Sequence, residues 1–450
     1  MIELLFSNKK EVAKIESSRQ AVLLNIASAD KKHVFVIYGP KGSGKTKIAQ
    51  DYVRSHANAF YISFGDLLEQ EALEAFRLQY VPEASEFSNW NEAVDAFIRK
   101  RNKRTTFLIF ENENSSAMNG CDHAFGKYIY CTHYVRACYI SPGENQYWDE
   151  VSFDVRYRTL QDYFNAFPNY SRQDLIRLHA LTGGILSVAK ELDDQCSFEE
   201  NIHRLLAYDS AFTNTLPMWL AQSFRSPESY YPIFKSIAGG HHRLSEIAKD
   251  IGFPNNKCGK YLEALIRHEY VIAEKTESGK QSTYYLANSY YVSWARYAYG
   301  KSALQVGMPD KLYEFVLNDI DLAVALPAFL SSCLRFIDRS TKEYLYEFRA
   351  SRVKHTQKDL SIKTSDGQEV TLDLCIQTED AMYVFVFQHS LETRYTKVEI
   401  ENIYDALRQK NYYYNTHITI FSIERFSDWC VHETSRNEWL HEVTLERLKY

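Results

Sequence analysis

The chain has 450 residues, which exceeds what one hydrophobic core usually supports, so two to four domains are expected. Its formal net charge of -6 excludes a surface that is basic throughout and coats nucleic acid, although it is compatible with a local basic face. The eight cysteines are scattered, with no C-x-x-C and no paired metal-ligand spacing, which predicts free thiols in a reducing compartment.

The N-terminal segment is expected to be neither a signal peptide nor a membrane anchor. Residues 1–6 are too short an apolar run and meet a charge too early. Further along, no stretch approaches the about 20 apolar residues that a membrane span needs. The sequence therefore predicts a soluble, cytoplasmic protein without a membrane partner. Residues 8–28 are expected to form an amphipathic helix.

The stretch from 33 to 53 combines a buried strand, a glycine-rich turn and the start of a helix. The turn fits G-x-x-x-x-G-K-[ST], the phosphate-binding loop of P-loop nucleotide hydrolases. Lys45 is expected to reach the β- and γ-phosphates of ATP, and the Thr46 hydroxyl to ligate Mg²⁺. Bound ADP would use the same loop. The predicted nucleotide-binding residues here are Gly39, Pro40, Lys41, Gly42, Ser43, Gly44, Lys45 and Thr46.

Strands and helices alternate through the rest of the first 157 residues. The expected elements are strands at 59–64, 105–110 and 137–141 and helices at 69–78 and 90–101. This alternation predicts a parallel sheet with crossover connections, in which ligands bind at the carboxyl ends of the strands. Gly39, Glu111 and Ser141 all fall at such ends.

Three further patterns follow toward the C-terminus. Residues 160–224 look helical, with a break at Thr182–Ile185. Residues 226–290 show three helices and a hairpin, which predicts a winged helix-turn-helix. After Gly300 the pattern becomes α+β. Its expected elements are helices around 311–337, strands at 369–374, 382–387 and 416–421, and a helix at 398–409.

Several segments occur in an order that is shared with one known family. They are Phe6–Glu11, the phosphate loop, Trp90–Ala93, Val155–Leu160, Thr182–Ile185 and Tyr285–Trp294. Over nearly its whole length the chain resembles the archaeal-type ATPase family of the AAA+/STAND superfamily. That resemblance implies a P-loop ATPase α/β domain at 1–157, a helical lid at 158–224, a winged helix-turn-helix at 225–298 and a degenerate PD-(D/E)xK nuclease-like domain at 299–450.

The chain departs from that family where hydrolysis requires carboxylates. The family places Asp-Glu after its third hydrophobic run, and this chain has Glu111 and Asn112 as the matching catalytic pair. Glu111 takes the metal-side position, whereas the Asn112 amide can orient water but cannot accept its proton. We therefore expect slow or absent hydrolysis with retained ATP binding. The alternative is that Glu113 or a loop residue substitutes.

Two further features concern the phosphates. Ser141 is expected to sense the γ-phosphate from the end of its strand. Arg156 or Arg158 would face a phosphate in one interpretation, while the favoured interpretation is that both are ordinary surface arginines.

The winged helix-turn-helix and the C-terminal domain suggest partners. Double-stranded DNA would be read by residues at the start of the third helix and touched by the wing, although such modules also serve only for packing. These residues are Asn255, Asn256, Lys257 and Lys260, with Lys275 and Lys280 on the wing. In the C-terminal domain Asp373 matches the metal-binding Asp of a nuclease, but Phe387-Gln388-His389 stands where Glu-x-Lys is required. We expect an inactive domain that binds a protein partner.

Three hypotheses follow from the sequence. The leading one is an ATP-binding AAA+/STAND-type protein, a weak or slow ATPase that acts as a nucleotide-dependent switch. The alternatives are a DNA-binding protein that uses its winged helix and a catalytically dead scaffold with a bound nucleotide.

Overall fold

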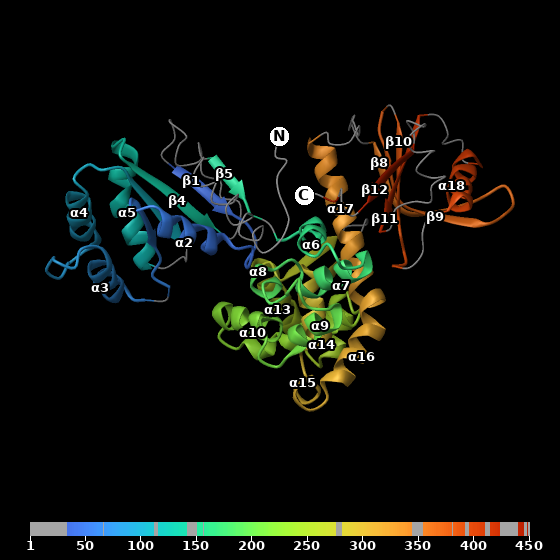
Figure 1. Cartoon of the computed structure of the whole chain (residues 1–450), viewed down its shortest axis with the longest axis horizontal. Helices are drawn as coiled ribbons and strands as arrows, with labels where there is room; N and C mark the ends of the chain where they lie inside the picture. Colours follow the sequence, from blue (N-terminus) through green and yellow to red (C-terminus); the bar gives the residue numbers. More distant parts are fainter. Residues whose placement is uncertain are drawn as a thin grey trace. The chain divides into compact units, whose positions relative to one another are not determined.

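The chain folds, in the computed structural model, into two compact units, Met1–Tyr157 and Arg158–Tyr450 (Figure 1). Each unit has its own core and is described by itself. The structure describes residues 34–65, 67–111, 116–141, 151–155, 157–275, 281–343, 354–379, 381–391, 396–409, 415–423, 440–444 and 448.

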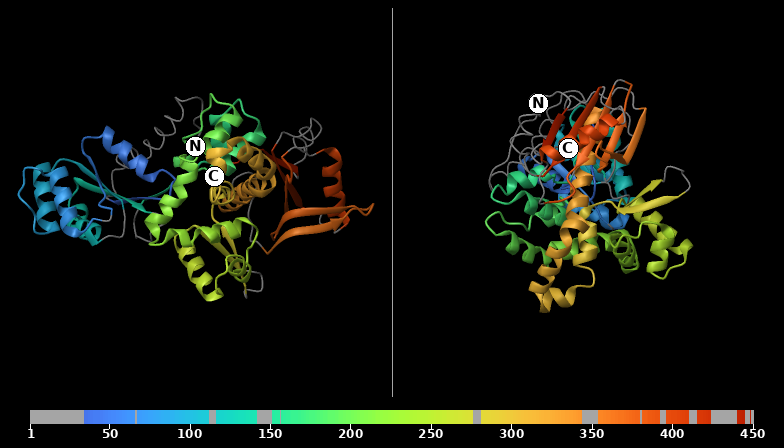
Figure 2. Two further views of the ribbon diagram at one scale, coloured as in Figure 1. Left: turned by 90° about the horizontal axis from the view of Figure 1, so that it is seen from below. Right: turned by 90° about the vertical axis from the view of Figure 1, so that its right-hand side faces the viewer.

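The first unit is a mixed α/β fold around a parallel sheet (Figure 2). Its five strands lie in the order β2-β3-β4-β1-β5, and every neighbouring pair runs parallel. The strands are β1 (Val34–Tyr38), β2 (Ala59–Ile62), β3 (Thr106–Glu111), β4 (Val135–Ser141) and β5 (Val151–Asp154). The helices are α2 (Lys45–Ser55), α3 (Glu69–Tyr80), α4 (Trp90–Arg101) and α5 (Ser116–Cys131). The predicted α/β fold class is confirmed.

Alternation along β3 divides the core of this unit into two layers. Phe107 and Ile109 pack with Ile48 of α2 on one face of the sheet. Leu108 and Phe110 pack with side chains of α3, α4 and α5 on the other face. Because helices cover both faces, strands β1 and β3 are buried on both sides, and their sequences read as continuous apolar runs.

Helix α5 and strand β5 differ from the sequence-based expectation, which contains neither. Helix α5 carries Gly120 and Gly126, which weaken intrinsic helix propensity. It nevertheless buries Cys121, Phe125 and Ile129 completely, at four-residue spacing on one face. Tertiary packing therefore outweighs local preference. Strand β5 has four residues and pairs with β1 at the sheet edge, which is too short for a clear pattern.

The second unit opens with a group of helices, most of which are capped. They are α6 (Leu160–Ala166), α7 (Arg172–Thr182), α8 (Leu186–Ala189), α9 (Phe198–Leu206) and α10 (Ala211–Ser223), followed by the 3-10 turn η1 (Pro227–Ser229). The helices α6, α7, α9 and α10 each begin after a hydroxyl residue whose oxygen accepts a backbone N–H of the first turn. These residues are Thr159, Ser171, Ser197 and Ser210.

The predicted break at Thr182–Ile185 lies between α7 and α8 and depends on two glycines. Gly183 and Gly184 adopt φ of 58° and 70°, which side-chain-bearing residues rarely do. A Cβ on Gly183 would lie 1.7 Å from Asn288 Oδ1, and a Cβ on Gly184 would lie 2.1 Å from the Arg158 carbonyl oxygen. Two distant segments therefore approach this turn closely.

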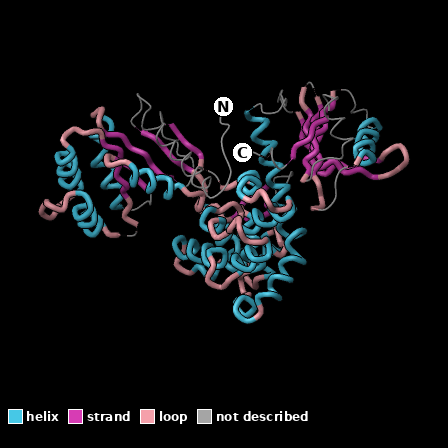
Figure 3. The backbone as a smooth tube through the Cα atoms, in the orientation of Figure 1, coloured by secondary structure: helices cyan, strands magenta, loops and turns pink. Residues whose placement is uncertain are grey.

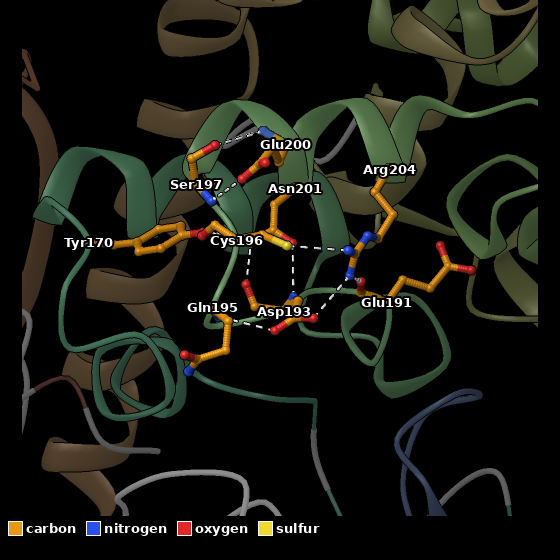
Figure 4. Close-up of polar contacts among 9 residues, drawn as sticks. All are labelled: Tyr170, Glu191, Asp193, Gln195, Cys196, Ser197, Glu200, Asn201 and Arg204. Atoms are coloured by element: carbon orange, nitrogen blue, oxygen red, sulfur yellow. Dashed lines mark hydrogen bonds and ion pairs between the residues drawn. The ribbon is translucent and has the colours of Figure 1, made fainter.

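A buried asparagine organises the loop between α8 and α9 (Figure 4). Asn201 is fully buried, and its Oδ1 accepts from the Asp193 N–H at 2.9 Å. Its Nδ2 donates to the Asp193 carbonyl at 2.8 Å and to the Tyr170 hydroxyl at 2.6 Å. Arg204 adds a hydrogen bond to the Glu191 carbonyl at 3.3 Å. The Asn201 side chain thus provides hydrogen-bond partners for the backbone N–H and carbonyl of Asp193.

The three helices and the hairpin predicted for residues 226–290 are present. They are α11 (Tyr231–Ala238), α12 (Leu244–Asp250), α13 (Asn255–Arg267), β6 (Val271–Lys275) and β7 (Ser282–Leu286), and α14 (Ser289–Tyr297) follows. Strands β6 and β7 pair antiparallel.

Helix α14 supplies a hydrogen-bond donor for a carbonyl that a proline leaves without one in α10. Pro217 lacks an N–H, so the Thr213 carbonyl has no ordinary helical donor, and Trp294 Nε1 donates to it at 2.9 Å. One residue earlier, the Tyr290 hydroxyl accepts from the Leu216 N–H at 3.0 Å and donates to the Phe212 carbonyl at 2.8 Å. These contacts give buried aromatic residues of α14 a structural role.

The C-terminal part places a five-stranded sheet between helices (Figure 3). Its elements are α15 (Ser302–Gly307), α16 (Pro309–Ile320), the π-helical turn η2 (Asp321–Ala325), α17 (Leu326–Glu343), β8 (His355–Lys363), β9 (Glu369–Gln377), β10 (Met382–Phe387), α18 (Lys397–Gln409), β11 (Thr416–Ser422) and β12 (Leu440–Thr444). Strands β8, β9 and β10 run antiparallel, and β10, β11 and β12 run parallel. Ile403 of α18 packs on Val384 and Ile418 of one face, and Phe336 of α17 meets Phe421 of the other.

The stretch Pro309–Ile337 departs from the expectation that nothing is long and apolar enough to span a membrane. Among the described residues it alone meets that test by length and composition, with a mean hydropathy of 1.7 in its 18-residue window. Of that window, 56% is buried inside the protein. Core helices of soluble proteins meet the same test, so the stretch is weak evidence for a membrane span.

The Tyr290 hydroxyl provides a test of the α10–α14 contact. Tyr290→Phe should lower the free energy of unfolding by about 2–4 kcal/mol, because it leaves a buried N–H and a buried carbonyl without their shared partner. Chemical denaturation of the whole chain measures this. Tyr208→Phe is the matched control, because Tyr208 is exposed and should change stability little. Equal stability of both variants would show that the hydroxyl does not support α10.

Candidate functional site

The glycine-rich loop between β1 and α2 has a tightly curled backbone. Gly39, Gly42 and Gly44 adopt φ of 147°, 83° and 97°, which lets the chain curl tightly. A Cβ on Gly39 would lie 2.1 Å from the Val155 carbonyl oxygen, so that glycine also allows the chain after β5 to approach the loop. No side chain caps the start of α2. A helix N-terminus behind such a loop favours an anion.

Lys45 lies folded over this loop. Its side chain is buried, and its ammonium donates to the Gly39 carbonyl at 2.5 Å and to the Pro40 carbonyl at 2.9 Å. The Tyr157 hydroxyl donates to the Lys41 carbonyl at 3.0 Å, and burial lowers the pKa of the Lys41 ammonium. The Lys45 ammonium therefore lies at the loop where the sequence predicted phosphates, held by the carbonyls of the loop itself.

Glu111 faces the start of α2 because of its position in β3. It shares the strand face of Phe107 and Ile109, which is the face that α2 covers. Thr46 Oγ1 donates to Glu111 Oε1 at 2.5 Å, so the two predicted metal-binding residues are in direct contact. A hydroxyl next to a carboxylate is the kind of oxygen donor set that suits Mg²⁺. The residues present thus fit the metal that the motif implies.

Tyr61 of β2 also contacts Glu111, which no sequence pattern predicted. Its hydroxyl donates to Glu111 Oε2, the oxygen that Thr46 leaves free. Tyr61 pairs with Ile109 in the parallel register of β2 and β3 and so lies on the same face. This contact depends on the register of two strands that lie over 40 residues apart in the chain, which no local pattern contains.

Of the other residues predicted for the nucleotide site, some are described by the structure and some are not. Ser141 ends β4 opposite Tyr38 of β1 in the ladder, so its backbone lies beside the strand that leads into the loop. Asn112 lies outside the described residues, as do Glu113 and the N-terminal segment Phe6–Glu11.

Arg158 corrects one interpretation of the sequence. It is buried, with 8% of its surface exposed, and is therefore not an ordinary surface arginine. Its backbone N–H donates to the Gly184 carbonyl at 2.9 Å, and its backbone carbonyl oxygen lies 3.1 Å from His179 Nε2. Burial lowers the pKa of His179 to about 3, so this imidazole stays neutral and donates to the carbonyl. Arg156 lies outside the described residues.

The residues predicted to read DNA lie together on the first turns of α13. Asn255, Asn256, Lys257 and Lys260 are all exposed. The Lys257 ammonium lies 3.9 Å from the centroid of the Phe253 ring, which holds it by a cation–π contact. Lys275 on the hairpin is exposed as well, and Lys280 lies outside the described residues.

Asp373 in β9 is engaged by the protein's own groups. It is buried, its Oδ2 accepts from the Phe387 N–H at 2.7 Å, and its Oδ1 lies 2.5 Å from His389 Nε2. Among the described residues no cluster of three or more His, Cys, Asp or Glu side chains could hold a metal ion. The His389 imidazole thus hydrogen-bonds to the carboxylate that a nuclease would use for its metal.

The comparisons with known proteins leave the family open. No family model matches the chain. An uncharacterized protein of Methanocaldococcus jannaschii is 24% identical over 163 residues, which is 35% of this chain. The match spans 36%, about a third, of the length of that relative.

Solved structures with P-loop ATPase folds are among the structural neighbours. Cdc6p from Pyrobaculum aerophilum is 11% identical with a TM-score of 0.32, and the match covers 70% of this chain and 97% of that one. A STAND ATPase with a tetratricopeptide repeat sensor from Pyrococcus horikoshii is 12% identical with a TM-score of 0.27, over 76% and 51%. Both TM-scores lie below 0.5, so the conclusions about the site rest on this chain's own geometry.

The Asp373–His389 pair predicts a pH dependence. Its hydrogen bond to Asp373 raises the pKa of His389 above the ordinary value. The stabilisation by this pair should be full below the unfolded-state pKa of about 6.5 and lost as pH rises through the raised folded-state pKa. His389→Gln, a neutral donor, should therefore lose more stability relative to wild type at acidic than at alkaline pH.

Thermal unfolding of wild type and His389→Gln across that pH range checks this expectation. NMR titration of labelled histidines provides a second measurement, with the His389 signal assigned by its loss in the variant. Asp373→Asn should lower the pKa of that signal. An unchanged pKa in Asp373→Asn would contradict the assignment of its cause.

Proposed function

We propose that the protein binds ATP with Mg²⁺ as a nucleotide-dependent switch of the AAA+/STAND type. The observation that carries this proposal is the contact between Thr46 and Glu111 beside a loop whose glycines and Lys45 form a phosphate cradle. Lys45 would exchange its loop carbonyls for the β- and γ-phosphates. Thr46 and Glu111 would hold Mg²⁺, which neutralises phosphate charge when bound.

Slow or absent hydrolysis belongs to the same proposal. Glu111 accepts from two hydroxyls, and its predicted place is on the metal side. Asn112, which stands at the position of the catalytic carboxylate, cannot take a proton from water. We therefore propose that binding, rather than turnover, changes how the remaining domains are held. These domains are the lid at 158–224, the winged helix-turn-helix at 225–298 and the nuclease-like domain at 299–450.

Nucleotide affinity of a loop variant tests this proposal. Lys45→Ala should bind ATP about 10- to 100-fold more weakly in Mg²⁺, since it removes charge-assisted hydrogen bonds to the phosphates. Lys47→Ala is the matched control, because Lys47 lies in the same helix and pairs with Asp51 at 2.7 Å. Isothermal titration calorimetry with ATP measures all three proteins.

Two results would contradict the proposal. Equal ATP affinity of wild type and Lys45→Ala would show that Lys45 does not hold the phosphates. Rapid phosphate release from ATP by wild type would instead contradict the switch with slow turnover.

A second candidate function is binding of double-stranded DNA through α13. The exposed amides and ammonium groups at its start favour it, because Asn can pair with adenine and Lys with guanine or phosphates. The C-terminal domain, with Asp373 already paired, is proposed to contact a protein partner instead of cutting nucleic acid.

Duplex DNA titrations at two salt concentrations test the second function. Lys257→Ala with Lys260→Ala should weaken binding and reduce the salt slope by about 1 for each lysine. Lys235→Ala in α11 is the exposed-lysine control and should leave binding unchanged. Binding without salt dependence, or a double variant that equals wild type, would exclude this role.

A further inference from the structure

We propose that Tyr61 is a positioning residue for the metal side of the proposed nucleotide site. It would hold Glu111 through Oε2, so that Oε1 stays directed at Thr46. This inference rests on the proposed function, because it concerns the Mg²⁺ that accompanies the nucleotide. It adds a residue that lies outside the phosphate loop and outside the strand that carries Glu111.

The first support is that both oxygens of Glu111 have separate donors. Thr46 Oγ1 donates to Oε1 at 2.5 Å, and the Tyr61 hydroxyl donates to Oε2. A carboxylate with one donor can still rotate about its terminal bond, whereas two donors on opposite oxygens fix its plane. The pair of hydroxyls therefore fixes the orientation of Glu111 before any ligand is bound.

The second support is that Tyr61 is itself held at both ends. Its ring packs, half-buried, against the core layer that contains Phe107 and Ile109. Its carbonyl accepts a hydrogen bond from the Tyr80 hydroxyl of α3. Burial raises the pKa of Tyr80, so this phenol keeps its proton at neutral pH. A donor that is anchored in this way can direct Glu111 instead of following it.

The third support comes from the chemistry of the Thr46 hydroxyl. A hydroxyl carries one donor and two lone pairs, so donation to Glu111 leaves Thr46 lone pairs for a cation. Mg²⁺ demands near-ideal octahedral geometry, and residues that orient its ligands affect affinity strongly. A carboxylate that Tyr61 holds still would keep the Thr46 lone pairs correctly aimed. The contribution of Tyr61 should therefore appear only when Mg²⁺ is present.

A purely structural role predicts something different. If the phenol of Tyr61 only satisfies a polar atom in the core, its loss lowers stability but affects ATP binding equally with and without Mg²⁺. The discriminating quantity is the ratio of ATP affinity in excess Mg²⁺ to ATP affinity in EDTA.

The experiment measures that ratio by calorimetry for wild type, Tyr61→Phe and Tyr139→Phe. Tyr139 is the matched control, because its hydroxyl donates to a carboxylate, Asp122 Oδ1, at 2.5 Å in the same unit. Tyr139 packs in the opposite core layer, away from α2. Tyr61→Phe should lower affinity about tenfold or more in Mg²⁺, within the range for groups that orient metal ligands, and leave it near wild type in EDTA. Tyr139→Phe should keep the wild-type ratio.

A second variant keeps the inference testable if Tyr61→Phe folds poorly, and a double mutant adds a check if it folds well. Glu111→Asp retains the carboxylate but shortens its reach, so it should lose the Tyr61 contact and reproduce the reduced ratio. In the Glu111→Gln background, Tyr61→Phe should cause no further loss of the ratio, because Tyr61 acts through the Glu111 carboxylate.

The outcomes separate this inference from the function on which it rests. Equal ATP affinity of wild type and Lys45→Ala overturns both. A wild type that shows no gain from Mg²⁺ also overturns both, because the proposed function includes the metal. If Lys45→Ala binds weakly and wild type gains from Mg²⁺ but Tyr61→Phe keeps the wild-type ratio, only the role of Tyr61 is overturned.

Discussion

The candidate site of this protein depends on the contact between Thr46 and Glu111. It joins the first turn of α2 to the end of β3, two strands away from β1 in the sheet. The contact exists because the side chains of β3 alternate between two core layers, and Glu111 continues the layer that α2 covers. The same alternation places Tyr61 beside Glu111 from the neighbouring strand. Packing of the apolar residues thus determines where the polar ones meet.

Away from the phosphate loop, several polar side chains hydrogen-bond to groups of the protein itself. Asn201 organises a loop, and the Tyr290 hydroxyl bridges the Leu216 N–H and the Phe212 carbonyl of α10. Asp373 is paired with His389 and a backbone N–H. A buried carboxylate with its own imidazole is satisfied without a metal ion. The contrast with Glu111, whose contacts are two hydroxyls beside the glycine-rich loop, directs the functional interpretation to the first unit.

Local sequence patterns predicted the parts of the fold and site that local physics determines. The phosphate loop follows from its glycines and its flanking strand and helix, and Glu111 follows from its place at the end of a buried run. The helices and hairpin of 226–290 were predictable because each has its own periodicity and turn residues.

The remainder depends on contacts between segments far apart in the chain. Helix α5 forms because it buries Phe125 and Ile129, despite its glycines. Tyr61 reaches Glu111 only through the register of β2 and β3, and the buried Arg158 donates its backbone N–H to Gly184 of a turn more than 20 residues away. The nuclease motif matched Asp373 and put His389 at the position of its lysine. It did not predict that the His389 imidazole would hydrogen-bond to the Asp373 carboxylate.

A crystal structure of the protein with Mg²⁺ and a non-hydrolysable ATP analogue tests the central claim most directly. The account predicts that the Lys45 ammonium leaves the Gly39 and Pro40 carbonyls for the β- and γ-phosphates. It also predicts that Thr46 and Glu111 lie at the metal while Tyr61 still donates to Glu111. A nucleotide bound elsewhere, or a loop in which Lys45 stays on its carbonyls beside the bound analogue, would contradict it.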